Sequence, residues 1–135
     1  HVLDKLAEAL DRVHGRGFAG SRVLLLGMAY KPNVDDIRES PALRLMELLR
    51  ARGAVVDYHD PFVPVLPPTR EHAALAGAES VALTPAALAG YHAALVVTDH
   101  AGVDYAQVAR HCPLVVDTRN ACARAGVVGA NVVKA

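Results

Sequence analysis

Short runs of consecutive apolar residues constrain the fold of this 135-residue chain more than any other feature. Four runs are clear, at 22–27, 54–58, 92–98 and 113–117. A strand that lacks polar alternation is buried on both faces, as the strands of a parallel sheet are. Parallel neighbours must be joined by crossover connections, which are usually helices. The runs therefore predict a parallel sheet covered on both sides.

Segments with helical spacing fill the gaps between these runs. Ser40 and Thr84 are good N-cap residues, and each is followed by a proline at the first helical position. Helices are expected over 2–16, 41–52, 85–89 and 103–111. This alternation predicts an α/β domain, Rossmann-like and doubly wound, with a mostly parallel sheet of about five to six strands and helices on both faces.

The region 59–83 is less regular, because four prolines interrupt it. We expect a short helix within 70–76 and a short strand at 80–83. The tail 126–134 is expected to add an edge strand.

Composition excludes several classes of protein. The chain has 14 basic and 14 acidic residues, so no basic field is available for nucleic acid. With 53% hydrophobic and 21% charged residues, it is globular. The sequence shows no signal peptide and no apolar run near the roughly 18 residues of a membrane span, which predicts a cytoplasmic protein. Cys112 and Cys122 match no zinc or redox spacing and are interpreted as small, partly buried hydrophobic residues.

Ligands of such sheets bind beyond the carboxyl ends of the strands. Polar residues follow every predicted strand end; they are Tyr30, Lys31, Asp35, Asp36, Arg38, His59, Asp60, Thr98, Asp99, His100, Asp117, Arg119 and Asn120. The first turn has only Gly27 and lacks G-x-G-x-x-G, so it is not an ordinary dinucleotide site. Lys31 suits a carbonyl or phosphate oxygen, and Arg38 could hold a phosphate or pair with a carboxylate. A solvated charged loop is the alternative.

Two other chemistries are disfavoured. The groups Tyr58-His59-Asp60 and Asp99-His100 could suggest a metal site, but no histidine pair has helical ligand spacing, and no metal is predicted. The absence of a nucleophile elbow argues against a hydrolase triad. Arg119 closes a strand end and could face the crevice beside Lys31 or lie on the surface.

The segment 23–43, which contains AYKPNVDDIRES at 29–40, resembles the C-terminal domain of the UDP-glucose/UDP-N-acetylhexosamine/GDP-mannose dehydrogenase family. Segments 56–61, 98–100 and 115–120 resemble it too, in the family's order. The resemblance implies an enzyme that oxidises C6 of a UDP-sugar to a uronate while two NAD are reduced. It also implies an N-terminal NAD-binding domain, a central helix that mediates dimerisation and a C-terminal domain that binds UDP.

Carried over residue by residue, the resemblance implies substrate contacts for Tyr30, Lys31 and Arg119, and a contact to NAD for Arg38. It implies that residues 1–18 are the tail of the inter-domain helix region and that 19–135 form the UDP-binding domain. The whole enzyme is expected to be a homodimer, without nucleic-acid or membrane partners.

The chain departs from the family in lacking both the glycine fingerprint and the catalytic cysteine. No catalytic residue is therefore assigned, and the chain alone is expected to be inactive, as part of a longer enzyme. The form of the loop slightly favours UDP-N-acetylhexosamine over UDP-glucose. The alternative is a non-catalytic Rossmann-like module that binds another nucleotide or a protein.

Overall fold

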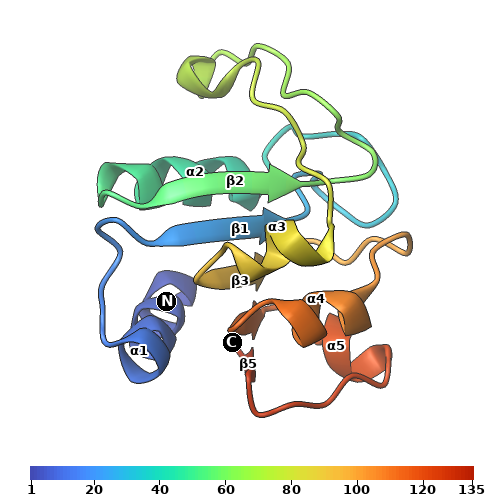
Figure 1. Cartoon of the computed structure of the whole chain (residues 1–135). Coiled ribbons are helices and arrows are strands. Elements are labelled where there is room, and N and C mark those ends of the chain that lie inside the picture. Colours follow the sequence, from blue (N-terminus) through green and yellow to red (C-terminus); the bar gives the residue numbers. More distant parts are fainter.

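The computed structural model describes all 135 residues and contains one five-stranded, fully parallel sheet (Figure 1). The strand order is β2-β1-β3-β4-β5. The strands are β1 (Arg22–Leu26), β2 (Val55–His59), β3 (Ala93–Val96), β4 (Val115–Asp117) and β5 (Val132–Lys134). The four apolar runs are strands as predicted, and the expected edge strand in the tail is β5. The predicted Rossmann-like α/β fold is confirmed.

Helices cover both faces of the sheet, and each face has its own core. The helices are α1 (Val2–His14), α2 (Pro41–Ala51), α3 (Pro85–Ala89), α4 (Tyr105–His111) and α5 (Ala121–Arg124). Alternate residues of β1 point to opposite sides, so Val23 packs with α1 and α2 while Leu24 packs with α3, α4 and α5. Such two-sided burial explains why the strand sequences show no polar alternation.

The predicted helix caps are present. The Ser40 Oγ accepts a hydrogen bond from the Ala42 backbone N–H, and the Thr84 Oγ1 accepts one from Ala87. Helix α1 belongs to the packed body of the domain, because Leu6 and Leu10 on it are fully buried. The division of the chain at residue 18 stays a prediction. None of the helices combines the length and hydropathy that crossing a bilayer requires.

Two expectations within 59–83 were wrong in extent. The helix expected at 70–76 is only the 3₁₀ turn η1 (Ala73–Leu75). The strand expected at 80–83 is an isolated bridge between Ser80 and Tyr58, because the chain leaves the sheet edge to reach the cap of α3. Helix α5 was not predicted, and its four residues are too few for helical spacing to reveal.

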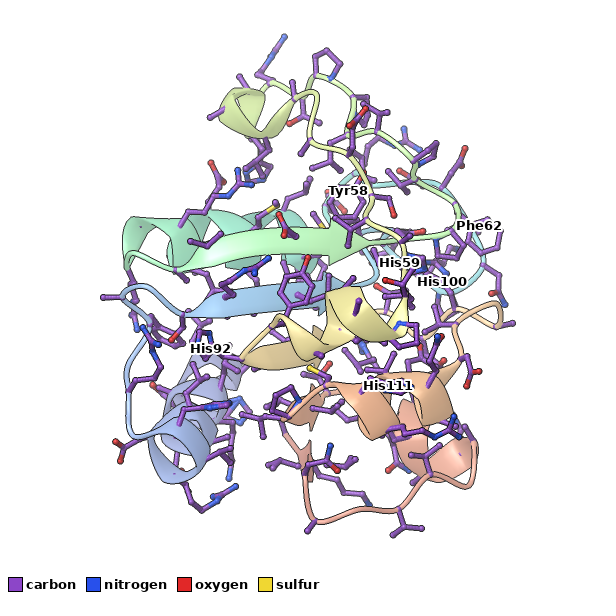
Figure 2. The ribbon with its side chains drawn as sticks, in the orientation of Figure 1. Tyr58, His59, Phe62, His92, His100 and His111 are labelled. Carbon is purple, nitrogen blue, oxygen red and sulfur yellow. The ribbon has the colours of Figure 1, made fainter.

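The carboxyl ends of all five strands meet at one edge of the sheet. His92 precedes β3 and His100 follows it, so the two rings mark opposite edges (Figure 2). The chain runs from β1 to β2 on one side and then crosses back to β3 on the other side of β1, so the direction of strand addition reverses at β1. Ligands of open α/β sheets bind at such a switch point, beyond the carboxyl ends.

Gly27 permits the close approach of the chain segments at this point. Its φ is 95°, and a Cβ atom there would lie 2.6 Å from the Thr98 Cβ. The turn after β1 is therefore packed against the end of β3 and has no room for a side chain.

Candidate functional site

A cavity of about 630 Å³ opens at the carboxyl edge of the sheet. Its walls come from the segments after β1, β3 and β4 and from the end of β5. The lining residues are Tyr30, Lys31, Pro32, Thr98, Asp99, Asp117, Thr118, Arg119, Asn120, Arg124, Lys134 and Ala135. Three residues predicted to contact the substrate, Tyr30, Lys31 and Arg119, thus line one cavity although they are far apart in the sequence.

Three cations of the cavity have no acidic partner. Lys31, Arg119 and Lys134 are exposed and form no salt bridge, whereas the Arg124 Nη2 lies 2.6 Å from the Asp99 Oδ2. An Arg and two Lys around one hollow suit a ligand with several anionic oxygens.

Backbone contacts fix the orientation of Arg119. Its Nε donates a hydrogen bond to the Val97 carbonyl at 2.8 Å, and its backbone N–H donates to the Asp117 Oδ1 at 3.0 Å. The Asp117 Oδ2 accepts from the Cys122 backbone N–H. Because the Asp117 carboxylate is occupied by these amides and buried, it shapes the turn after β4, and the Nη groups of Arg119 have no protein partner.

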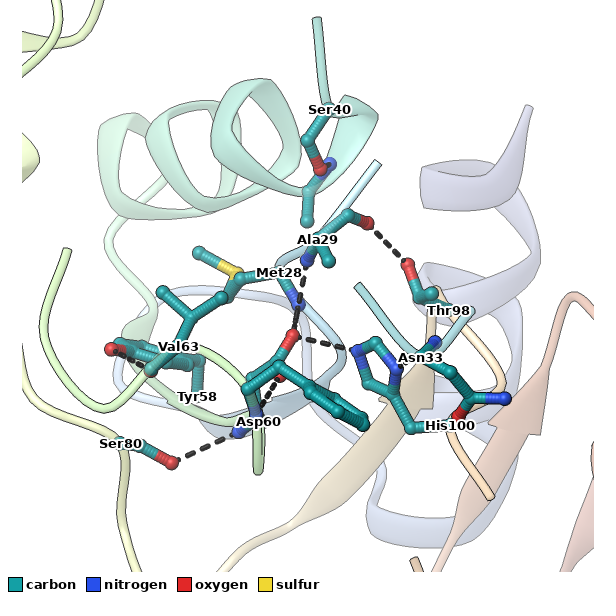
Figure 3. A network of polar contacts seen from close by, with 12 residues as sticks. Met28, Ala29, Asn33, Ser40, Tyr58, Asp60, Val63, Ser80, Thr98 and His100 are labelled. Atoms are coloured by element: carbon teal, nitrogen blue, oxygen red, sulfur yellow. Dashed lines mark hydrogen bonds and ion pairs between the residues drawn. The ribbon is translucent and has the colours of Figure 1, made fainter. Parts of the chain in front are cut away.

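A buried polar network holds the loop that carries Tyr30 and Lys31 (Figure 3). The Asp60 Oδ2 accepts hydrogen bonds from the backbone N–H groups of Met28 and Ala29. It also accepts one from the His100 Nε2, and the Thr98 Oγ1 donates to the Ala29 carbonyl. Residues from the ends of β2 and β3 thus anchor the loop after β1.

The structure assigns the tautomer of His100. The backbone N–H of Asn33 donates to the His100 Nδ1 at 2.8 Å, so that nitrogen is an acceptor and the proton is on Nε2. Both ring nitrogens are occupied, and the side chain is fully buried. The His59 Nδ1 contacts the Val81 carbonyl, and the Asp99 Oδ2 pairs with Arg124. The chain brings no three His, Cys, Asp or Glu side chains together at a metal-binding distance.

Arg38 lies outside the cavity, on the far part of the loop. Its Nε and Nη2 donate to the two carboxylate oxygens of Asp36, each at 3.0 Å, and its side chain is 86% exposed. Hydrogen bonds from Arg38 lower the pKa of Asp36 to about 2. The structure does not bring Arg38 together with Tyr30, Lys31 and Arg119.

Both cysteines are buried thiols, more deeply buried than expected. Cys112 and Cys122 are each 1% exposed, and burial raises the pKa of both. For Cys122, burial and then the nearby Asp117 carboxylate raise the pKa to about 12. Thiols in this state are poor nucleophiles, and the assignment of neither cysteine as a catalytic residue stays a prediction.

Sequence reasoning missed two charged lining residues, Arg124 and Lys134. Arg124 lies on the unpredicted helix α5. Lys134 ends β5, and its place could have been inferred, because a charged residue at the end of an expected parallel strand reaches the same edge as Lys31.

Comparison with known proteins identifies the family. Residues 24–124 match the UDP-binding domain of the UDP-glucose/GDP-mannose dehydrogenase family. The chain is 32% identical to the UDP-glucose 6-dehydrogenase TuaD of Bacillus subtilis (strain 168), over 89% of this chain and 25% of that protein. The chain thus spans about a quarter of the length of this relative.

Solved structures agree. The chain resembles an NDP-N-acetyl-D-galactosaminuronic acid dehydrogenase from Methanosarcina mazei Go1, with a TM-score of 0.75 and 25% identity over 100% of this chain and 28% of that one. It also resembles a UDP-glucose dehydrogenase from Pyrobaculum islandicum, with a TM-score of 0.60 and 31% identity over 86% of this chain and 26% of that one. The resemblance noted in the sequence is therefore confirmed, and this chain belongs to the UDP-glucose/GDP-mannose dehydrogenase family, an oxidoreductase family, as a UDP-binding domain.

Proposed function

We propose that the cavity binds the UDP part of a UDP-sugar and that the chain serves an NAD-dependent nucleotide-sugar 6-dehydrogenase. The observation that carries this proposal is the set of three unpaired cations, Lys31, Arg119 and Lys134, around one hollow at the switch point. A diphosphate offers the anionic oxygens that such a set binds. The reaction proposed for the whole enzyme converts a UDP-sugar to a UDP-uronate.

Each lining residue has a role in this proposal. Lys31 and Lys134 supply flexible point charges, whereas Arg119 supplies a guanidinium in a fixed orientation. Tyr30 lines the cavity and is 48% exposed, so its ring can stack on the uracil base. The chain's own contribution is to bind and orient the substrate.

The residues of this chain do not fit a complete NAD site. The turn after β1 is closed by Thr98 and lacks the glycines that let a pyrophosphate approach the backbone. NAD, when bound by another part of the enzyme, accepts hydride. Arg38 remains our candidate for a contact to it, since its guanidinium is exposed away from the UDP cavity.

The relatives do not favour one sugar. Two of the named relatives are UDP-glucose dehydrogenases and one is an NDP-N-acetyl-D-galactosaminuronic acid dehydrogenase, so the slight preference for UDP-N-acetylhexosamine gains no support from them. A cytoplasmic, homodimeric whole enzyme stays a prediction from the sequence.

Calorimetric titration of the chain with UDP tests the proposal. Lys31→Ala should weaken UDP binding by about tenfold, the effect expected for one charge-assisted hydrogen bond. Lys5→Ala is the matched control, because Lys5 is an exposed lysine of α1 outside the cavity. The alternative, a module for another nucleotide, is favoured if ADP or GDP outcompetes UDP. Absence of UDP binding by the unaltered chain refutes the proposed function.

A further inference from the structure

We propose that Asp60 and His100 are positioning residues that set the shape of the segment carrying Tyr30 and Lys31 for UDP. This inference rests on the proposed function and goes beyond it, because neither side chain lines the cavity. Both are buried and polar, and every hydrogen bond that they make with the loop after β1 goes to its backbone.

Asp60 holds the start of the segment. It follows β2 and is 1% exposed. Its Oδ2 accepts from Met28 N–H at 2.7 Å and Ala29 N–H at 3.0 Å, while its Oδ1 accepts from Phe62 N–H at 2.8 Å. Three backbone N–H groups from two segments of the chain thus donate to one carboxylate, which fixes the position of these donors.

His100 holds the end of the segment. Its Nε2 donates to the Asp60 Oδ2 at 2.8 Å, and its Nδ1 accepts from the Asn33 N–H at 2.8 Å. Asn33 has a φ of 61°, and its Oδ1 accepts from the Ala101 N–H, which ties the loop to the segment after β3 a second time. The ring of Phe62 lies 4.9 Å from the His100 ring and covers it.

The two anchors bracket the proposed ligand contacts. The first anchor ends at Ala29 and the second begins at Asn33, so only Tyr30, Lys31 and Pro32 lie between them. Two fixed points this close restrict where the Lys31 ammonium can reach, and restricting a ligand-binding group in advance lowers the entropy cost of binding. A pair of apolar residues could fill the same space without a buried charge, but it could not bind the loop amides.

Two substitutions of His100 test its two hydrogen bonds separately, the one to Asp60 and the one from Asn33. In His100→Gln, the side-chain amide N–H can replace Nε2–H toward Asp60, but no acceptor faces Asn33. In His100→Asn, the shorter side chain offers an oxygen to Asn33 and no longer reaches Asp60. His92→Gln is the matched control, because the His92 Nδ1 also accepts a backbone N–H, that of Arg22, at the opposite edge of the sheet (Figure 2).

The readouts are UDP affinity by calorimetry and amide hydrogen exchange by NMR. We expect both His100 variants to weaken UDP binding by about tenfold, the loss typical of one buried hydrogen bond. Exchange should rise at Asn33 in His100→Gln and at Met28 and Ala29 in His100→Asn. His92→Gln should leave UDP affinity unchanged. If the His100 variants fail to fold, Asn33→Gly is the substitute. Glycine accepts the positive φ of this position, and the substitution removes the hydrogen bond from the Ala101 N–H to the Asn33 Oδ1. We expect it to weaken UDP binding as well.

The possible failures are distinct. If the unaltered chain does not bind UDP, the proposed function is wrong. If the unaltered chain binds UDP and the folded variants bind it equally well, the positioning role is refuted while the function stands. Faster exchange at the loop amides without a change in UDP affinity would show a purely structural tether and would also overturn the inference.

Discussion

Arg119 shows how one side chain combines a structural and a binding role. Its Nε donates a hydrogen bond to the Val97 carbonyl, whereas its Nη groups line the cavity and have no protein partner. A lysine at this place has one nitrogen and cannot satisfy both. We therefore expect Arg119→Lys to weaken UDP binding nearly as much as Arg119→Ala, each by about tenfold. Titration with UDP checks this, and a lysine variant with unaltered affinity would show that only the charge matters.

Gly27 combines a positive φ with a close approach to Thr98, so no other residue is expected to fit there without strain. Gly27→Ala places a methyl group 2.6 Å from the Thr98 Cβ and imposes a left-handed φ on alanine. We expect the free energy of unfolding to fall by roughly 2–4 kcal/mol, because steric overlap adds to backbone strain.

Gly77→Ala is the control for this experiment, since Gly77 has a φ of 87° but no atom lies within 4 Å of the place that its methyl group would take. It should cost only the strain, about 1 kcal/mol. Urea unfolding measures both variants. Equal losses would mean that crowding at the switch point contributes nothing.

Sequence reasoning named some residues of the site and could not name others. Tyr30, Lys31 and Arg119 follow strands, so topology alone brings them to one edge. The pairing of His100 with Asp60 joins residues 40 positions apart through side-chain geometry. Neither spacing nor composition reveals which ring nitrogen contacts which amide. The sequence could therefore disfavour a metal site and a hydrolase triad at these residues, but it could not predict their pairing.

At the scale of elements, the strands were predictable and the segment after β2 was not. A buried parallel strand needs an unbroken apolar run, which the sequence displays openly. The segment 59–83 is instead held by single contacts from a neighbouring strand. The Tyr58 hydroxyl donates to the carbonyls of Val63 at 2.8 Å and Ala78 at 3.2 Å. Such contacts leave no period in the sequence.

Tyr58 also makes stability depend on alkaline pH. Burial, and then the negative charges of Asp60 and Glu79, raise the pKa of Tyr58 to about 12. An unfolded tyrosine has a pKa near 10, so the unfolded state loses its proton first. Stability from the protonated hydroxyl is therefore complete below about pH 10 and is lost as pH rises toward 12, by roughly 2 kcal/mol.

Urea unfolding at about pH 8, 10 and 11 measures this decrease in the free energy of unfolding. Tyr58→Phe should be less stable at pH 8, by about 1–3 kcal/mol, because two carbonyls lose their donor. Its stability should also fall less steeply than that of the unaltered chain above pH 10. Parallel curves for the two proteins would assign the alkaline loss to other groups, such as Tyr91, whose pKa burial and Asp57 also raise.

At the scale of the whole molecule, the parallel sheet is what makes the cavity. Lys31 follows the first strand and Lys134 ends the last, yet both face one hollow, because every strand runs in the same direction. In an antiparallel sheet, successive strands end at opposite edges, so their carboxyl ends share no common edge. The binding site is thus a property of the complete domain, and ligand binding should be coupled to its folding.

We therefore expect this chain to bind UDP without catalysing the oxidation of a UDP-sugar. We expect no NADH when the pure chain is mixed with NAD and UDP-glucose or UDP-N-acetylglucosamine, because both thiols are buried and held protonated, and because the turn after β1 does not fit a pyrophosphate. UDP should nevertheless stabilise the chain, by about 2.7 kcal/mol at a hundredfold excess over Kd, since it binds only the folded state. Absorbance of NADH and the thermal midpoint with and without UDP measure the two parts. NADH production would place a catalytic group within these 135 residues, whereas an unchanged midpoint at saturating UDP would mean that the folded domain has no affinity for the nucleotide.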